Sequence, residues 1–107
     1  TAALILEDAG YTVSVATNGV QALEQVRKEA CDLVVLDLVM PEKEGAETVM
    51  EIRRLKPSLP VLAISGVVGA DFYLHAARML GATATLRKPF SARELLDQVE
   101  ALQARTE

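Results

Sequence analysis

The stretch Leu33–Leu36 reads Leu-Val-Val-Leu and is followed directly by Asp37. An uninterrupted apolar run of this length is typical of a strand that is covered on both faces in a parallel sheet. The run Val61–Ile64 (Val-Leu-Ala-Ile) has the same character, and Thr83–Arg87 is a weaker example. The sequence therefore predicts three buried strands.

A further strand is predicted at Tyr11–Ala16, where Val13 and Val15 alternate with polar residues. Between the strands, apolar residues recur every three or four positions, which predicts helices. These residues are Val20, Leu23, Val26 and Ala30, then Val49, Ile52 and Leu55, then Leu95, Leu96, Val99 and Leu102. The apolar segment Ala70–Leu80 is a further helix. Alternating strands and helices with short loops predict a three-layer α/β fold, a parallel sheet with helices on both faces.

Local signals mark several helix ends. Ser91, followed three residues later by Glu94, predicts a capping box at the start of the last helix. Gly10 and Gly81 lie where helix ends need a residue in the left-handed conformation. No linker or repeat divides the chain, so we expect residues 1–107 to form one domain.

Three polar residues follow the predicted buried strands: Asp37, Ser65 and Lys88. Taken singly, Asp37 reads as an exposed loop acid, Ser65 as a turn residue and Lys88 as a solvated charge. Functional sites in open α/β sheets lie at the carboxyl ends of the strands, so the three should converge. A carboxylate that can attack phosphorus, with a hydroxyl and an ammonium to hold its oxygens, suits phosphoryl transfer.

Composition narrows the class of protein. The chain has 107 residues and a net charge of -4, which argues against binding of nucleic acid by this segment. A single cysteine excludes an internal disulfide, and no apolar run is long enough to cross a membrane. We expect a cytoplasmic protein.

Four motifs identify a family. They are Asp37–Pro41 (Asp-Leu-Val-Met-Pro) with Gly45, then Ile64–Gly66, then Gly81–Ala82, and finally Lys88–Phe90. Together they resemble the receiver domains of response regulators in two-component signalling, over almost the whole chain. Leu6–Val13 and Thr17–Gly19 with Ala22–Leu23 resemble the end of the family's first helix, its second strand and the start of its second helix.

The resemblance implies a flavodoxin-like (CheY-like) parallel sheet and a role for each strand-end residue. Asp37 would accept a phosphoryl group from a histidine kinase or a phosphotransfer protein. Ser65 would be the switch hydroxyl and Lys88 the ammonium that pairs with the phosphoryl group. Asp37 and the Val39 backbone carbonyl would be ligands of Mg²⁺, and the Lys88–Pro89 peptide bond would be cis.

The sequence departs from the family at its start. Receiver domains have a first strand that ends in acids, which help to hold the metal. Glu7 and Asp8 end an apolar run, but only Ala9 and Gly10 separate them from the Tyr11 strand, and a parallel crossover needs a dozen residues or more. We therefore expect Thr1–Ala9 to be the end of the first helix, with Glu7 and Asp8 as surface acids. The domain would lack its first strand, and Mg²⁺ would bind weakly or not at all.

Other residues are given ordinary roles. Thr85 stands three positions before Lys88, where the family tends to have an aromatic residue, and we interpret it as a plain strand residue. His75 has no partner to suggest a metal site. We expect Cys31 to be a buried or half-buried thiol, and Phe90 to be a core or docking residue.

Two alternatives remain. The chain could be a degenerate receiver that takes no phosphate and acts as an interaction or dimerisation module, for which the apolar Phe72–Leu80 helix is the candidate homodimer surface. A phosphatase resembling the haloacid dehalogenases would need a second acid two residues after Asp37, where this chain has Val39. We therefore expect a signalling module and not an enzyme.

Overall fold

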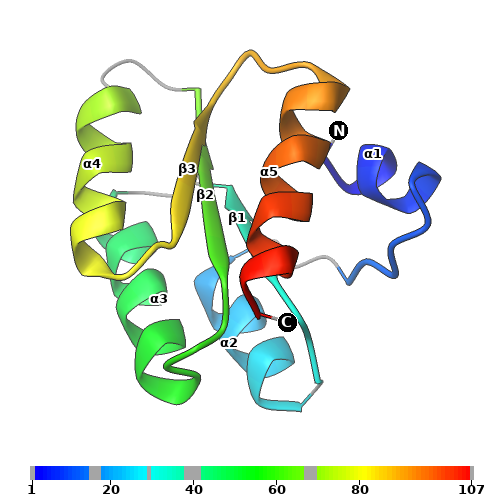
Figure 1. The fold of residues 1–107 in the computed structure, drawn as a ribbon. Helices are drawn as coiled ribbons and strands as arrows, with labels where there is room; N and C mark the ends of the chain where they lie inside the picture. The colour runs from blue at the N-terminus through cyan, green and yellow to red at the C-terminus, as the bar shows by residue number, and fades with distance from the viewer. Residues whose placement is uncertain (1, 15–17, 29, 38–41, 67–69, 107) are drawn as a thin grey trace.

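The computed structural model describes residues 2–14, 18–28, 30–37, 42–66 and 70–106. These residues contain a three-stranded parallel sheet in the order β1-β2-β3 (Figure 1). The strands are β1 (Val34–Asp37), β2 (Val61–Ser65) and β3 (Ala84–Arg87). Each overlaps one of the predicted buried strands and differs from it by no more than one residue at either end.

Five helices surround the sheet in the described part of the chain. They are α1 (Ala2–Asp8), α2 (Gly19–Lys28), α3 (Glu42–Leu55), α4 (Ala70–Leu80) and α5 (Ala92–Thr106). Figure 1 shows α1 and α5 on one side of the strands, and α2, α3 and α4 on the other. The predicted three-layer α/β fold is thus confirmed. None of the described helices is both long and apolar enough to span a membrane.

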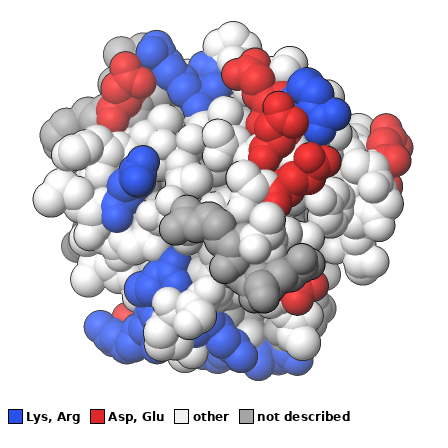
Figure 2. Space-filling model, in the orientation of Figure 1, with Lys and Arg blue, Asp and Glu red and all other residues white. Residues whose placement is uncertain are grey.

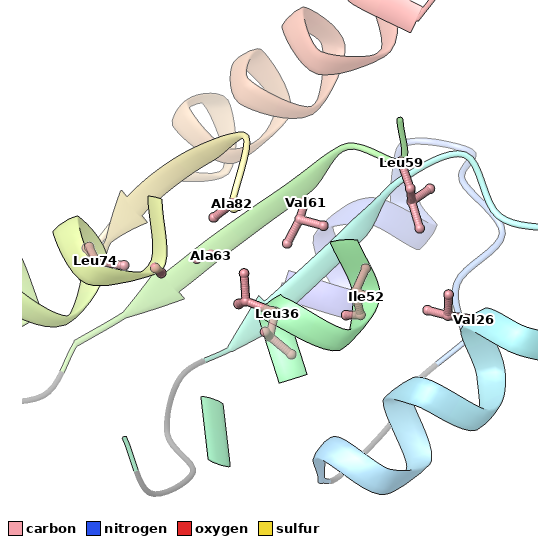
Figure 3. Close-up of a cluster of buried hydrophobic side chains, with 10 residues drawn as sticks. Val26, Leu36, Ile52, Leu59, Val61, Ala63, Leu74 and Ala82 are labelled. Atoms are coloured by element: carbon pink, nitrogen blue, oxygen red, sulfur yellow. The ribbon is translucent and has the colours of Figure 1, made fainter. Parts of the chain in front are cut away.

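The two faces of the sheet carry separate cores. In β2, Val61 and Ala63 belong to a cluster with the buried residues of α2, α3 and α4 (Figure 3). Leu62 and Ile64 belong to a second cluster with α1 and α5. All four side chains have exposed fractions of 1% or less. This two-sided burial explains why the strand is an unbroken apolar run, because successive side chains point to opposite faces.

The predicted strand at Tyr11–Ala16 is wrong as far as it can be followed: Tyr11–Ser14 has no strand assignment, and residues 15–17 lie outside the described part. A strand requires a neighbour for its backbone groups. In the described sheet, β1 pairs only with β2. Tyr11 and Val13 are nevertheless half-buried and pack against the α1 and α5 cluster. The alternating sequence therefore reports burial of one face rather than strand pairing.

Residues 2–8 form α1, and the chain turns at Ala9 and Gly10, so the expectation of a helix at the start of the chain is confirmed. Gly10 has φ 97° and Gly81 has φ 130°, in the left-handed region predicted for both. Glu7 and Asp8 are exposed, as expected of surface acids.

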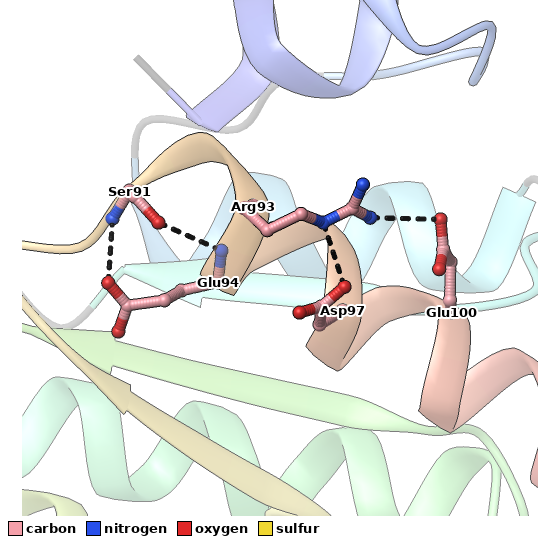
Figure 4. A network of polar contacts seen from close by, with 5 residues as sticks. All are labelled: Ser91, Arg93, Glu94, Asp97 and Glu100. Carbon is pink, nitrogen blue, oxygen red and sulfur yellow. Dashed lines mark hydrogen bonds and ion pairs between the residues drawn. The ribbon is translucent and has the colours of Figure 1, made fainter.

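The capping box of α5 is also confirmed. The Glu94 backbone N–H donates to Ser91 Oγ at 3.1 Å, and the Ser91 N–H donates to Glu94 Oε1 at 3.1 Å (Figure 4). Further along α5, Arg93 pairs with Asp97 at 2.9 Å and with Glu100 at 3.4 Å. Figure 2 shows acidic side chains beside a basic one on this side of the molecule. All three partners are more than half exposed, so these ion pairs add little to stability.

Candidate functional site

The sheet brings the three predicted site residues to one edge. Asp37 ends β1 and stands opposite Ile64, and the next residue, Ser65, ends β2. Ser65 stands opposite Arg87, the last residue of β3, and Lys88 follows directly. The strands are parallel, so all three residues lie at the carboxyl-terminal rim of the sheet, where sites in such folds are found.

Ser65 is the most unusual of the three. Its side chain has an exposed fraction of 0%, and its hydroxyl oxygen has no hydrogen-bond partner among the described residues. Leaving a buried hydroxyl unsatisfied costs about 1–3 kcal/mol. Nearly all buried polar side-chain atoms in native proteins avoid this cost. The Ser65 hydroxyl therefore has unused capacity to bind a group at this rim.

Lys88 is held beside Ser65 through the backbone. Its N–H donates to the Ser65 carbonyl at 2.9 Å, which extends the β2-β3 ladder by one residue beyond β3. The Lys88–Pro89 peptide bond is cis, as predicted. Lys88 itself is half-buried. The two residues thus form a unit whose relative position is fixed by the main chain.

The predicted magnesium ligands lie largely outside what the structure describes. Asp37 is placed by its backbone at the end of β1, but its side chain and the whole of Val39 fall outside the described atoms. Among the described residues, no group of three or more His, Cys, Asp or Glu side chains is arranged to hold a metal ion. These residues do not by themselves make a Mg²⁺ site, since that ion prefers six oxygens.

Four residues outside the rim were given ordinary roles from the sequence, and the structure places each of them. Thr85 is a half-buried residue of β3, opposite Ala63, as expected of an ordinary strand residue. Phe90 is half-buried and packs against the α1 and α5 cluster, which confirms the core interpretation. His75 is exposed on α4. The expectation for Cys31 is wrong: the residue is exposed, because it precedes β1 instead of lying within the layers.

The apolar helix α4 is divided between two roles. Leu74 and Ala77 are buried in the cluster with α2 and α3, so part of its apolar character belongs to the core. Met79 is 76% exposed, the most exposed large apolar side chain of the described residues. The side chains of Phe72 and Tyr73 lie outside the described atoms. Met79 is thus the described residue that fits the predicted homodimer surface.

Sequence reasoning missed one residue of the rim. Gly66 follows Ser65, and in the sequence it is only the last residue of the family motif Ile64–Gly66. The structure places it against the Lys88 side chain, which would lie 2.7 Å from a Cβ atom at position 66. The available signal was a glycine immediately after a buried strand, which often marks a close approach of another group.

Comparisons with known proteins agree with this fold. The response regulator receiver domain family matches residues 1–100. The chain is 42% identical over 93 residues to the response regulator receiver protein Anae109_2439 of Anaeromyxobacter sp. (strain Fw109-5), covering 87% of this chain and 39% of that protein. It is 42% identical over 85 residues to the transcriptional regulatory protein ZraR of Klebsiella oxytoca, covering 79% of this chain and 19% of that protein. The chain spans less than half the length of these curated relatives.

Solved structures give the same result. The receiver domain of NtrX from Brucella abortus superimposes with a TM-score of 0.86 at 30% identity, covering 96% of this chain and 87% of that one. A CheY-like response regulator receiver domain protein from Methanospirillum hungatei JF-1 gives a TM-score of 0.85 at 27% identity, covering 99% and 86%. With the family match over residues 1–100, these likenesses agree with the parallel sheet described above. The chain belongs to the response regulator receiver domain family of two-component signalling systems.

Proposed function

We propose that this receiver domain accepts a phosphoryl group on Asp37 from a histidine kinase or a phosphotransfer protein. The observation that carries the proposal is the Ser65 hydroxyl, which is fully buried and has no partner among the described residues. It lies at the same sheet edge as the Asp37 backbone and Lys88. A phosphoryl oxygen at this rim would give the hydroxyl the acceptor that it lacks.

The proposed reaction is a single displacement at phosphorus. A carboxylate oxygen of Asp37 attacks the phosphorus of a phosphohistidine, a P–O bond forms, and the P–N bond to the imidazole breaks with both its electrons. The imidazole takes up a proton from water, and Asp37 becomes an acyl phosphate. The Lys88 ammonium would balance the charge on the phosphoryl oxygens, and the Ser65 hydroxyl would donate a hydrogen bond to one of them.

The product of the proposed reaction is the phosphorylated domain itself, which carries the signal. Receiver domains of response regulators are signalling modules, and a partner would recognise the phosphorylated form. The energy for the change would come from the contacts that Ser65 and Lys88 make only when the phosphoryl group is present, because a ligand shifts an equilibrium only through such differential contacts.

Intact-mass measurement of the complete protein tests the proposal. Incubation with acetyl phosphate and Mg²⁺ should add one phosphoryl group to the wild-type protein and none to Asp37→Asn. Asp32→Asn is a matched control, since Asp32 is exposed and lies before β1, and it should label as wild type. Equal labelling of Asp37→Asn and wild type would place the nucleophile elsewhere.

A second candidate function is a degenerate receiver that works as an interaction module without phosphate. It is favoured by one observation: Thr85, a half-buried residue of β3, stands three positions before Lys88, where receiver domains tend to have an aromatic residue. The same measurement separates the two functions. A wild-type protein that takes no label from acetyl phosphate or from a phosphorylated kinase domain, and yet forms dimers, would support the second.

A further inference from the structure

We propose that the amino-terminal end of the sheet carries a docking surface for an acidic, extended segment of a second protein. The surface consists of a hollow between the chain before β1 and the connection from α3 to β2, together with exposed cations at the ends of α2 and α3. We call it the basic groove. It lies at the opposite end of the parallel strands from Ser65, so the inference is independent of the proposed phosphorylation.

The hollow has a volume of about 450 Å³. Cys31 and Asp32, which come just before β1, line one side of it, and residues 55–60, between the end of α3 and β2, line the other. Leu55 is 36% exposed, so an apolar side chain borders water at this hollow. Covering it with an apolar group of a partner would be favourable, because apolar surface would be removed from water.

Hydrogen bonds fix the walls of the hollow, so it exists before a partner arrives. The Arg53 guanidinium donates to the Lys56 carbonyl at 3.3 Å and to the Pro57 carbonyl at 2.7 Å, and both acceptor residues line the hollow. The Val34 N–H donates to the Pro60 carbonyl at 2.9 Å, which joins the two sides where β1 begins. A surface that is rigid before binding loses little conformational entropy when it binds.

The charge at this end is opposite to that of the whole chain. The chain has 11 Lys and Arg against 15 Asp and Glu, but residues 27–32 and 53–60 contain five cations and only two acids. Figure 2 shows Lys and Arg side chains gathered along the lower edge of the molecule, where α2 and α3 end in Figure 1. The five cations are Arg27, Lys28, Arg53, Arg54 and Lys56, and all but Arg53 are exposed.

The helix dipole explains part of this charge. A cation in the last turn of a helix interacts favourably with the dipole, which accounts for one cation at the end of α2 and one at the end of α3. Lys56 lies beyond α3 and lines the hollow, so it needs another explanation. Arg54 pairs with Glu51 at 3.0 Å, but its side chain is 71% exposed. Such an exposed pair adds little to stability, so Arg54 can exchange it for a carboxylate of a partner.

Charge and shape together indicate the kind of partner. Exposed Lys and Arg attract carboxylates, and Leu55 at the hollow favours an apolar group. An acidic segment with one bulky apolar side chain meets both conditions. Single-stranded nucleic acid fits less well, because none of the eight residues that line the hollow is aromatic, and bases bind such surfaces largely by stacking on aromatic side chains.

The position of the groove allows two proteins to bind at once. The connections that form it precede β1 and β2, whereas Asp37 and Ser65 end these strands. The five residues of β2 separate the two ends of the sheet by about 13 Å. A second protein can therefore stay bound at the basic groove while a kinase reaches Asp37.

Fluorescence anisotropy of the complete protein with a labelled synthetic peptide tests the proposal. The probe has one leucine flanked by three glutamates on each side. We expect saturable binding that weakens about tenfold when the leucine of the peptide is replaced by glycine. Lys56→Glu in the protein should weaken binding about fivefold. Arg93→Glu is the matched control, since Arg93 is 64% exposed on α5 and the change alters the net charge equally. It should weaken binding by less than about twofold.

Four outcomes would overturn the proposal. No binding at about 1 mM peptide, or an equal loss in Lys56→Glu and Arg93→Glu, would show that the groove does not hold an acidic segment. Displacement of the peptide by single-stranded DNA at a lower concentration than that of the peptide would assign the surface to nucleic acid. A dimer in sedimentation that Lys56→Glu dissociates would assign it to a second copy of this chain.

Alkylation of Cys31 locates the bound peptide. Cys31 is exposed, lines the hollow and is the single cysteine of this sequence. Saturating peptide should slow its reaction with iodoacetamide severalfold, as measured by mass mapping of the alkylated protein. Lys56→Glu should still be phosphorylated by acetyl phosphate as wild type is, so the proposed function and this inference can fail separately. An unchanged rate of Cys31 alkylation in the presence of bound peptide would place the peptide elsewhere and contradict the proposal.

Discussion

The two ends of the sheet differ in how completely their polar groups are paired. At the amino-terminal end, the Arg53 guanidinium makes five hydrogen bonds to groups from two separate parts of the chain. Its shortest contacts are to the Pro57 and Gly81 carbonyls, both at 2.7 Å. Arg53 also donates to the Thr83 hydroxyl, which in turn accepts the Val61 N–H at 3.0 Å. At this end, one arginine side chain therefore uses its guanidinium N–H groups to link the end of α3 to the start of β3.

At the carboxyl-terminal end, one buried polar group is left without a partner among the described residues. This group is the hydroxyl of Ser65. Gly66 has no side chain, and Lys88 closes on it. The amino-terminal end therefore contributes hydrogen bonds that stabilise the fold, whereas the carboxyl-terminal end has a hydroxyl that could bind a further group. We expect substitutions at the amino-terminal end to change the free energy of unfolding. Substitutions at the carboxyl-terminal end should change the rate at which Asp37 is phosphorylated.

The largest effect on stability should come from Arg53→Ala. The change leaves the carbonyls of Lys56, Pro57 and Gly81 without this donor, and hydrogen bonds to charged groups contribute about 1.5–3 kcal/mol each, though not additively. We expect a loss of about 2–4 kcal/mol in urea unfolding. The phosphorylation rate of the folded protein should stay within about twofold of wild type.

Arg54→Ala is the matched control for that experiment. Arg54 is the next residue of α3, its side chain is 71% exposed, and it pairs only with Glu51 on its own helix among the described contacts. Exposed ion pairs of this kind contribute about 0–1 kcal/mol. Equal losses for the two arginine variants would mean that the saturated end does not stabilise the fold.

Ser65→Ala tests the carboxyl-terminal end of the sheet. Removing a buried hydroxyl that lacks a partner should leave the free energy of unfolding unchanged or raise it by about 1 kcal/mol. Thr48 is the matched control, because it is also buried, at 3% exposed, but has a polar interaction in the structure. Thr48→Val should lower stability by about 1 kcal/mol. A larger loss for Ser65→Ala than for Thr48→Val would show that its hydroxyl is satisfied in the resting protein.

The smallest effect on folding is expected for Met79→Asp on α4. This residue is 76% exposed, so its replacement should change stability by no more than about 0.5 kcal/mol. If the Phe72–Leu80 helix is a self-association surface, the change should shift sedimentation toward the monomer. Val20→Asp is the control, since Val20 is 66% exposed on α2. Sedimentation that is indifferent to Met79→Asp would remove this helix as an interface.

The sequence could predict the elements that are buried on both faces. The strands β1, β2 and β3 were predicted to within one residue at each end. The side chains of β1 and β2 pack in two clusters and leave unbroken apolar runs, whereas β3 contains Thr85 and Arg87 and gave a weaker signal. Helix α5 was predictable from its capping box. The Tyr11 segment was not, because alternation of apolar residues reports one buried face and is silent about whether a neighbouring strand pairs with it.

The rim of the sheet was predictable only in part. Asp37, Ser65 and Lys88 could be found because each follows a predicted strand. The missing partner of the Ser65 hydroxyl and the closeness of Gly66 to Lys88 depend on distances between residues more than 20 positions apart. Three of the five hydrogen bonds of Arg53 are of the same kind, since their acceptors Gly81 and Thr83 are 28 and 30 positions away. A hydrophobic pattern contains no information about such contacts.

Chemical mapping of the phosphorylated residue shows whether Asp37 is the phosphoryl acceptor. Borohydride reduces an acyl phosphate of aspartate to homoserine, so the modified position can be read from peptide masses after reduction of the acetyl phosphate-treated complete protein. We predict homoserine at position 37 alone, and no homoserine in the Asp37→Asn variant. Homoserine at another aspartate, or a phosphoryl group that survives borohydride because it is an ester of Ser65 or another hydroxyl, would contradict the proposal that Asp37 accepts the phosphoryl group.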